Sequence, residues 1–194
     1  MNRAKVQRGI KMLLEGLGED PSRAGLVDTP RRVADMVECF SKVWGPADGE
    51  IFDVRFAVER YDGFVLMKNI KFSSFCEHHL LPFFGNISLC YIPVNDSVTG
   101  LSRLVRIVDK YSKRLQLQER LTVQIADGIS ANVENRGVFV LVEAHHMCIA
   151  ARGVCQPDCS TVTRALRGEF SSNSALASQV QQLILAGGGR CHGS

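Results

Sequence analysis

The alternation of apolar and polar residues predicts helices near the start of the chain. Across residues 3–17 apolar side chains recur at helical spacing, and Asp20-Pro21 ends that pattern. Thr29-Pro30 then begins a second helix, with Thr29 as the N-cap and Pro30 at the first helical position. We expect this helix to end at Gly45 and to bury one apolar face, which comprises Val33, Met36, Val37, Phe40 and Trp44.

The rest of the chain alternates between pairs of strands and pairs of helices. Runs of this kind are typical of an α+β layer and not of a repeated βαβ unit. We expect a small sheet of four strands whose free edges pair between subunits. The expected elements are strands at 64–72 and 86–93, a turn at Asn95-Asp96, helices over 101–111 and 119–134, strands at 138–142 and 146–152, and a helix over 173–186.

Length and composition fit one soluble domain. The 194 residues are 45% apolar and 22% charged, and the net charge of +3 is too small to predict nucleic-acid binding. No apolar run is long enough to span a membrane, and basic residues interrupt the first fifteen positions, unlike a signal peptide. We therefore expect a cytoplasmic protein without a membrane partner, whose seven cysteines are mostly reduced.

Two short segments carry the residue types of a catalytic metal site. These are Cys76-Glu77-His78-His79 and His146-Met147-Cys148. Zinc is held by thiolate and imidazole ligands, and a catalytic zinc uses three of them so that the fourth position can hold water. Within the first segment, one histidine would bind the metal and the other would carry protons. If 146–152 is a regular strand, His146 shares a face with Cys148 and can act on what the metal activates.

Other interpretations of these cysteines and histidines remain open. The same residues could form a structural zinc site or simply belong to the core, although structural sites do not need surplus histidines. Cys155 and Cys159 could chelate a metal or form a disulfide, but no histidine accompanies them, and we favour free loop thiols. Cys39 and Cys90 look like core residues, and Cys191 is a thiol of the tail.

An anion site is expected where the helix over 101–111 begins. Ser102 suits the N-cap position, and a helix N-terminus attracts phosphate. Arg103 and Arg106 are three residues apart and share a helix face, although surface arginines would show the same spacing. Arg152 would share the strand face of Cys148. Gln118 and Glu119 suit a guanine edge, because a carboxylate accepts from both N1–H and the 2-amino group, but Glu119 could equally be a helix-start carboxylate.

Taken together, these segments resemble GTP cyclohydrolase I. The similarity runs in order from about residue 5 to 186, at family-like spacing. The segments that carry it are Glu19-Asp20-Pro21 with Gly25-Leu26, Thr29-Pro30-Arg31-Arg32, Cys76-Glu77-His78-His79-Leu80, Gly100-Leu101-Ser102 through Arg106-Ile107-Val108, Gln118-Glu119-Arg120-Leu121-Thr122, His146-Met147-Cys148, Arg152-Gly153-Val154 and Leu166-Arg167-Gly168.

The resemblance implies a fold, an assembly and a reaction. The fold is the tunnelling fold, an antiparallel four-stranded sheet with paired helices. It would comprise an N-terminal helical region at 1–60, a catalytic domain at 61–186 and a disordered tail at 187–194. Copies would assemble into a toroidal homodecamer with active sites at subunit interfaces. The reaction converts GTP and water to 7,8-dihydroneopterin triphosphate and formate, the first step of pteridine biosynthesis.

The resemblance also implies a role for each matching residue. Zn²⁺ would be held by Cys76, His79 and Cys148, and the proton-transfer residues would be His78 and His146. The substrate-binding set would be Ser102, Arg103, Arg106 and Arg152 on the triphosphate, with Gln118 and Glu119 on the guanine.

The sequence departs from the family pattern at a few positions, none of which removes a ligand or catalytic residue. Position 103 is Arg where the family usually has Lys, and His145 stands beside His146 where a small residue is usual. We expect His145 to face away from the site. The alternatives are a related pterin- or purine-binding enzyme and a non-catalytic binding subunit. A generic zinc deaminase is disfavoured because its Pro-Cys-x-x-Cys segment is absent.

Overall fold

The computed structural model describes residues 1–41, 55–58 and 61–186, and the chain divides into two compact units, Met1–Gly45 and Pro46–Ser194. The first unit contains helices α1 (Arg3–Gly16) and α2 (Thr29–Ser41). Asn2 caps α1 by accepting from the backbone N–H of Lys5. Helix α2 begins at the predicted Thr-Pro pair, but Thr29 is already its first helical residue, and the first helical hydrogen bond runs from the Arg32 N–H to the Asp28 oxygen. The prediction of Thr29 as the N-cap is therefore wrong by one residue. The expected helix end at Gly45, the side chain of Trp44 and the tail at 187–194 lie outside the described residues.

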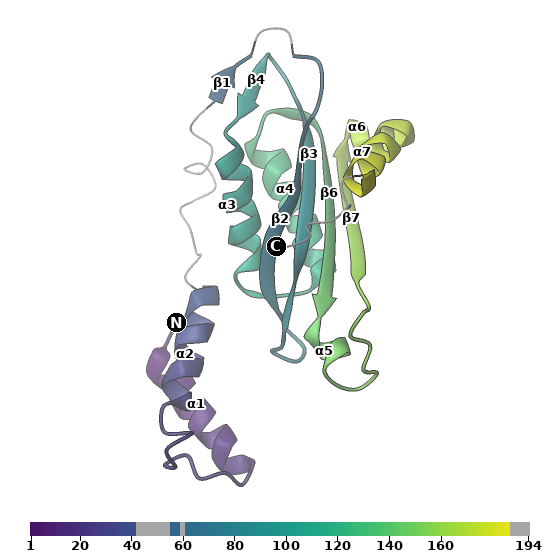
Figure 1. Ribbon diagram of the computed structural model, residues 1–194. Helices are drawn as coiled ribbons and strands as arrows, with labels where there is room; N and C mark the ends of the chain where they lie inside the picture. Colours follow the sequence, from purple (N-terminus) through teal and green to yellow (C-terminus); the bar gives the residue numbers. More distant parts are fainter. Residues whose placement is uncertain (42–54, 59–60, 187–194) are drawn as a thin grey trace, which may run out of the picture. The chain divides into compact units, whose positions relative to one another are not determined.

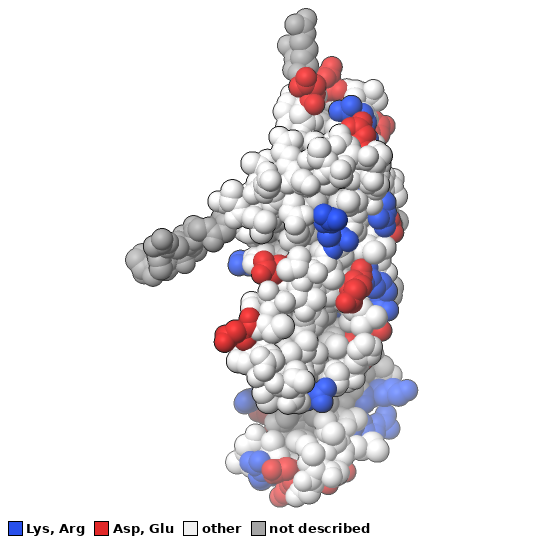
Figure 2. Space-filling model, turned by 90° about the vertical axis from the view of Figure 1, so that its right-hand side faces the viewer, with Lys and Arg blue, Asp and Glu red and all other residues white. Residues whose placement is uncertain are grey.

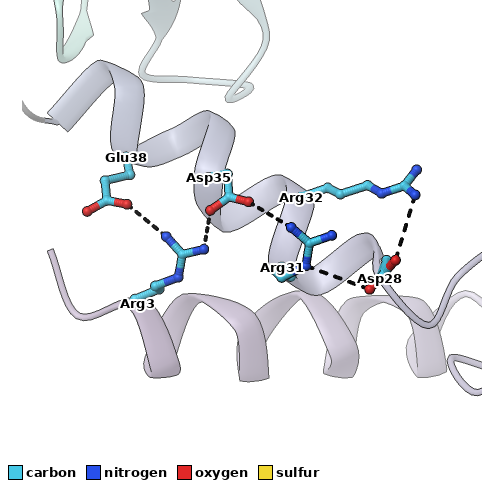
Figure 3. A network of polar contacts seen from close by, with 6 residues as sticks. All are labelled: Arg3, Asp28, Arg31, Arg32, Asp35 and Glu38. Atoms are coloured by element: carbon cyan, nitrogen blue, oxygen red, sulfur yellow. Dashed lines mark hydrogen bonds and ion pairs between the residues drawn. The ribbon is translucent and has the colours of Figure 1, made fainter.

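Ion pairs join the two helices of this first unit (Figure 3). Arg3 on α1 contacts both Asp35 and Glu38 on α2, with 2.8 Å from its Nη1 to Oε2 of Glu38. The predicted burial of one α2 face is wrong at Met36, whose side chain is 47% exposed. The separate prediction that Cys39 is a core residue is also wrong, because Cys39 is exposed. Apolar spacing along a helix marks a face but does not say what covers it.

The second unit is built on a sheet of five strands, not four. Its order is β5-β2-β3-β6-β7, antiparallel except for the β2–β5 pair. The short strands β1 and β4 form a separate antiparallel pair. The bounds of the strands are β1 Arg55–Ala57, β2 Val65–Cys76, β3 Pro82–Pro93, β4 Ser97–Thr99, β5 Leu115–Gln116, β6 Asn135–His146 and β7 Thr161–Gly168.

Helices cover both faces of this sheet (Figure 1). Helices α3 (Leu101–Ser112) and α4 (Gln118–Asn132) pack on one face, where Leu104, Ile107 and Leu121 join the larger core cluster. Helices α6 (Glu169–Ser172) and α7 (Ser174–Ala186) pack on the other face around Phe139 and Phe170. The fold is therefore α+β, as the order of predicted elements indicates.

The expected strand at 146–152 is wrong, and the strand at 161–168 was missed. The chain leaves β6 at His146 and forms the short helix α5 (Met147–Ala150). Along β7, Thr163 and Ala165 lie on the face of the sheet that packs against α4, and Val162 is exposed. The strand therefore lacks the large apolar residues on its buried face by which a strand is recognised in a sequence.

Close packing between β3 and β6 requires one glycine. Gly85 pairs with Ala144, and a Cβ at Gly85 would lie 2.0 Å from the backbone oxygen of Glu143. Since backbone atoms cannot yield as the end of a side chain can, only glycine fits there. This contact brings the two strands together two residues from Phe83 and His146, which pair across them.

The turn at Asn95-Asp96 is confirmed, with positive φ at both residues, as a two-residue type I′ hairpin requires. The N-cap of α3 is Gly100 and not Ser102, which lies exposed in the first turn. In the described part of the chain no helix is long and apolar enough to cross a membrane. On the face drawn in Figure 2, acidic and basic side chains are interspersed.

Candidate metal centre

The hairpin between β2 and β3 returns His79 toward Cys76. Two backbone hydrogen bonds close it: Cys76 donates to the Leu81 oxygen at 2.8 Å, and Leu80 donates to the Cys76 oxygen at 2.9 Å. Leu80 has φ 53, in the left-handed region that non-glycine residues rarely adopt. The tight turn therefore places a histidine three positions after a cysteine beside that same cysteine.

The third soft ligand arrives from the end of β6. Because α5 begins directly after His146, Cys148 enters the site from a helical turn and not by strand alternation. The ligand atoms of Cys76, His79 and Cys148 all lie within 4.8 Å of one another. Three ligands of one tetrahedral zinc ion lie about 3.5 to 4 Å apart, so a small contraction around an ion completes the geometry.

The electrostatics of the two thiols fit a cation. Burial and the neighbouring Cys76 thiol raise the pKa of Cys148. Two thiolates at this distance repel each other, and a divalent cation between them removes that penalty by binding both in their ionised form. The donor set of two sulfurs and one imidazole is one that zinc prefers. The residues therefore fit the metal that the sequence predicts.

His146, two residues before Cys148, is held by contacts with Phe83 and Gln118. Its ring stacks on Phe83, with centroids 4.7 Å apart and planes 2° from parallel. Its Nε2 lies 2.7 Å from Oε1 of Gln118, and burial lowers the pKa of the imidazole. The charge of the exposed Glu119 raises that pKa and the charge of His145 lowers it, and both effects are smaller than that of burial.

Gln118 has a contact that the sequence did not indicate. Its side chain is 2% exposed, and its Nε2 lies within hydrogen-bond distance of the Val142 oxygen, the Thr161 oxygen and Oγ1 of Thr163. The amide nitrogen of Gln118 is thus already hydrogen-bonded within the protein. Phe83 and Thr163 were missed as members of the site, because neither the start of β3 nor β7 was predicted.

The remaining histidines and Arg152 have distinct positions. His78 is exposed and lies outside the ligand group, with its ring 6.2 Å from that of His79. His145 is exposed and alternates with His146 along β6, so it faces away from the site as expected. Nη2 of Arg152 lies 2.5 Å from Nε2 of His79. Arg152 thus contacts a ligand from the loop after α5, and not from the regular strand that was expected.

Three of the expected anion-binding residues, Ser102, Arg103 and Arg106, lie in the first half of α3. The helix begins near β4, at the far end of the sheet from α5 and the β2–β3 hairpin (Figure 1). Beyond its last turn, the Arg114 oxygen accepts from Ser74, close to the metal end of β2. Twelve helical residues rise about 18 Å. Within one chain, the metal ligands are therefore separated from Ser102, Arg103 and Arg106.

Arg103 is buried at this distant end, with 8% exposure, whereas Arg106 is exposed. Nη1 of Arg103 has no hydrogen-bond partner among the described residues. A buried donor without a partner is costly, and an anion at the start of α3 would satisfy it. The two arginines differ in burial although they are three residues apart, so they would approach an anion from different depths.

Comparisons with known proteins identify the family of this chain. The model of the GTP cyclohydrolase I family matches residues 6–185. The GTP cyclohydrolase 1 of Desulforamulus reducens is 46% identical over 181 residues, which are 93% of this chain and 96% of that protein. The enzyme of the same name from Listeria welshimeri is 47% identical over 186 residues, covering 95% of this chain and 97% of that protein.

Structural similarity to solved proteins is more distant. The apo crystal structure of the archaeosine synthase QueF-Like aligns with 56% of this chain and 97% of that protein, at TM-score 0.45 and 22% identity. This likeness is too low to indicate a shared activity. The family match covers every residue of the metal cluster and both flanking histidines. The chain therefore belongs to the GTP cyclohydrolase I family of enzymes.

Proposed function

We propose that this protein hydrolyses and rearranges GTP to 7,8-dihydroneopterin triphosphate with release of formate, the first step of pteridine biosynthesis in the cytoplasm. The observation that carries the proposal is the three-ligand cluster of Cys76, His79 and Cys148 with His146 beside it. The family match over residues 6–185 supports the choice of GTP as the substrate.

The metal we propose is zinc, held by Cys76, His79 and Cys148. In a site with three protein ligands, zinc leaves one coordination position open and activates water for hydrolysis. The rest of the chemistry belongs to the side chains. Phe83 and Gln118 hold the imidazole of His146 beside the cluster, where it exchanges protons with the purine. His78, exposed on the same hairpin, is the second proton carrier.

Glu119 is the residue we propose for guanine. It is exposed at the first turn of α4, and a carboxylate can accept from both N1–H and the 2-amino group. Because the amide of Gln118 is hydrogen-bonded to Thr161 and to His146, we assign Gln118 the role of holding His146. The predicted contact between Gln118 and guanine stays a prediction. Arg152 would reach the substrate triphosphate from beside His79.

The triphosphate site requires a second copy of the chain. Ser102, Arg103 and Arg106 lie in the first half of α3, away from the candidate metal ligands, so we propose that a neighbouring subunit presents them to the metal end of this one. The exposed edge strand β7 and the exposed Phe84 and Val162 on the sheet support an interface between copies. The proposed assembly is the toroidal homodecamer of the tunnelling fold.

The test is incubation of purified, zinc-loaded protein with GTP, with formate and the pterin product measured together. Equal amounts of both are expected. A ring-opened product without formate would indicate a shortened reaction on the same scaffold. If neither product forms although zinc is bound, the catalytic proposal is wrong and a binding role replaces it.

A further inference from the structure

The metal-ligand hairpin is tied to helix α4 by one ion pair. Glu77 follows the ligand Cys76 in the hairpin, and Arg120 lies in the first turn of α4, directly after Glu119. Nη2 of Arg120 donates to Oε2 of Glu77, and Nη1 lies 3.5 Å from Oε1. The hydrogen bond from Arg120 is the largest effect that holds the pKa of Glu77 below its usual range.

A buried glutamine orients the guanidinium of Arg120. Gln116 is fully buried, and its Oε1 accepts from Nε of Arg120 at 2.9 Å. The amide nitrogen of Gln116 donates in turn to the backbone oxygen of Tyr111 at 2.9 Å and to Oε1 of Gln124 at 2.8 Å. With its Nε held in this way, the planar guanidinium of Arg120 directs both terminal nitrogens toward Glu77, and Nη2 also lies 3.5 Å from the backbone oxygen of Leu115.

The same glutamine also holds the backbone of the hairpin. Cys76 pairs with Gln116 in the parallel β2–β5 ladder, and the N–H of Glu77 donates to the Gln116 oxygen at 3.1 Å. The backbone bond and the side-chain contact therefore fix Glu77 from two directions. Because Glu77 lies in the short loop that joins Cys76 to His79, fixing it limits the positions that the two ligands can take.

We propose that Arg120 is a positioning residue for the metal site. It holds the hairpin so that Cys76 and His79 stay at binding distance, and it joins that hairpin to the start of α4, where Glu119 lies. The proposal deepens the proposed function, because it takes the bound metal to be zinc. An ion pair as exposed as this one, with side chains 41% and 31% exposed, adds little to global stability, so its effect on the metal can be separated from folding.

The experiment compares zinc release from Arg120→Gln, Glu77→Gln and the double variant with release from the wild-type protein. A chelator in excess reports the zinc dissociation rate, and thermal unfolding of the zinc-free proteins reports the stability of the fold. Both single variants are expected to release zinc about tenfold faster, the usual size of effect for groups that support metal ligands. The zinc-free Tm of Glu77→Gln should stay within about 3 °C of wild type, because this change removes only the exposed ion pair. Arg120→Gln also removes the donor to the buried Oε1 of Gln116, so its zinc-free Tm should fall further.

The double variant and a control variant make the test specific. If Arg120 and Glu77 act through one contact, the double variant releases zinc no faster than the faster single variant. Asp127→Asn is the matched control, because it removes another partly exposed ion pair of α4, the one to Arg167 at 2.7 Å. Asp127→Asn should leave zinc release unchanged.

Three results would contradict the proposal. Wild-type release rates in both single variants would show that the pair does not hold the hairpin. Faster release in Asp127→Asn as well, with matching loss of Tm, would reduce the effect to general stability. A wild-type protein that binds no zinc would contradict the proposed function itself, and this inference with it.

Discussion

At the scale of single residues, Gln118 determines which nitrogen of His146 is free. The amide nitrogen of Gln118 is surrounded by three oxygens, so its own oxygen must be the atom that faces His146. Oε1 can only accept, and Nε2 of His146 therefore carries the proton of that 2.7 Å hydrogen bond. In the neutral ring Nδ1 is then left as the acceptor. The short segment His146-Met147-Cys148 predicts the histidine but not this choice of nitrogen.

The first prediction concerns His146. Replacing it with Ala should leave one zinc bound per chain, because His146 is not among the ligand atoms that converge. Formate release from GTP should fall at least about 100-fold, as expected when a general acid or base is removed. Metal analysis and a formate assay measure the two effects.

His145→Ala is the matched control for this change. His145 is the preceding residue, exposed on the other side of β6, and its removal should leave formate release near the wild-type rate. Loss of zinc from His146→Ala would contradict the assignment of Cys76, His79 and Cys148 as the complete ligand set.

At the scale of elements, periodicity predicts the helices better than the strands. Helices α3, α4 and α7 lie within one or two residues of their expected bounds, because each has an apolar stripe that packs on the sheet. Strand β7 and helix α5 were missed or mistaken because their local residues carry no such stripe. Their conformation depends on pairing with β6 and on the turn after His146.

The packing of α6 and α7 on the outer face of the sheet leads to a second prediction. Cys90 lies in that core, and burial raises the pKa of its thiol to about 12. In the unfolded chain the same thiol ionises near pH 9. The unfolded state therefore loses a proton that the native state keeps, and the free energy of unfolding falls between pH 9 and about 12. The slope from this group is at most about 1.4 kcal/mol per pH unit.

Urea unfolding at a series of pH values from 8 to 11 measures this effect. The control is Cys90→Ala, which lowers stability at every pH but removes the part of the slope that belongs to the thiol. Subtracting the two curves isolates Cys90 from other groups that titrate in the same range, including Tyr91, whose pKa is also raised by burial. Identical slopes for the two proteins would show that Cys90 is accessible to solvent in the native state.

At the scale of the whole molecule, the predicted site residues fall into two groups. One group lies around the cluster of Cys76, His79 and Cys148, and the other lies in the first half of α3, which begins at the other end of the sheet (Figure 1). A single chain holds both groups but does not bring them together. Under the proposed function a second chain would bring the two groups together, so the activity would depend on assembly.

The prediction at this scale is complementation between two inactive variants. His146→Ala removes the proposed proton-transfer residue at the metal end of each site, and Arg106→Ala weakens the proposed triphosphate end. Each variant alone should release little formate from GTP. If a site combines residues of two chains, subunits exchanged by mild dissociation and reassembly form some sites that carry neither change, and activity returns. A mixture that stays as inactive as its components after confirmed exchange would place each site within one chain.

The sequence by itself indicated the cysteines and histidines of the candidate metal site, the α+β class and most helices, because these depend on residue types and on spacing within short segments. Cys76 and His79 share one hairpin, so three positions of sequence translate directly into proximity. Only the tertiary structure decided the five-strand order, the hydrogen bond between Gln118 and His146, and the separation of Arg103 from the metal. Each of these depends on distances between elements far apart in the chain, which strand pairing and core packing set and local patterns do not record.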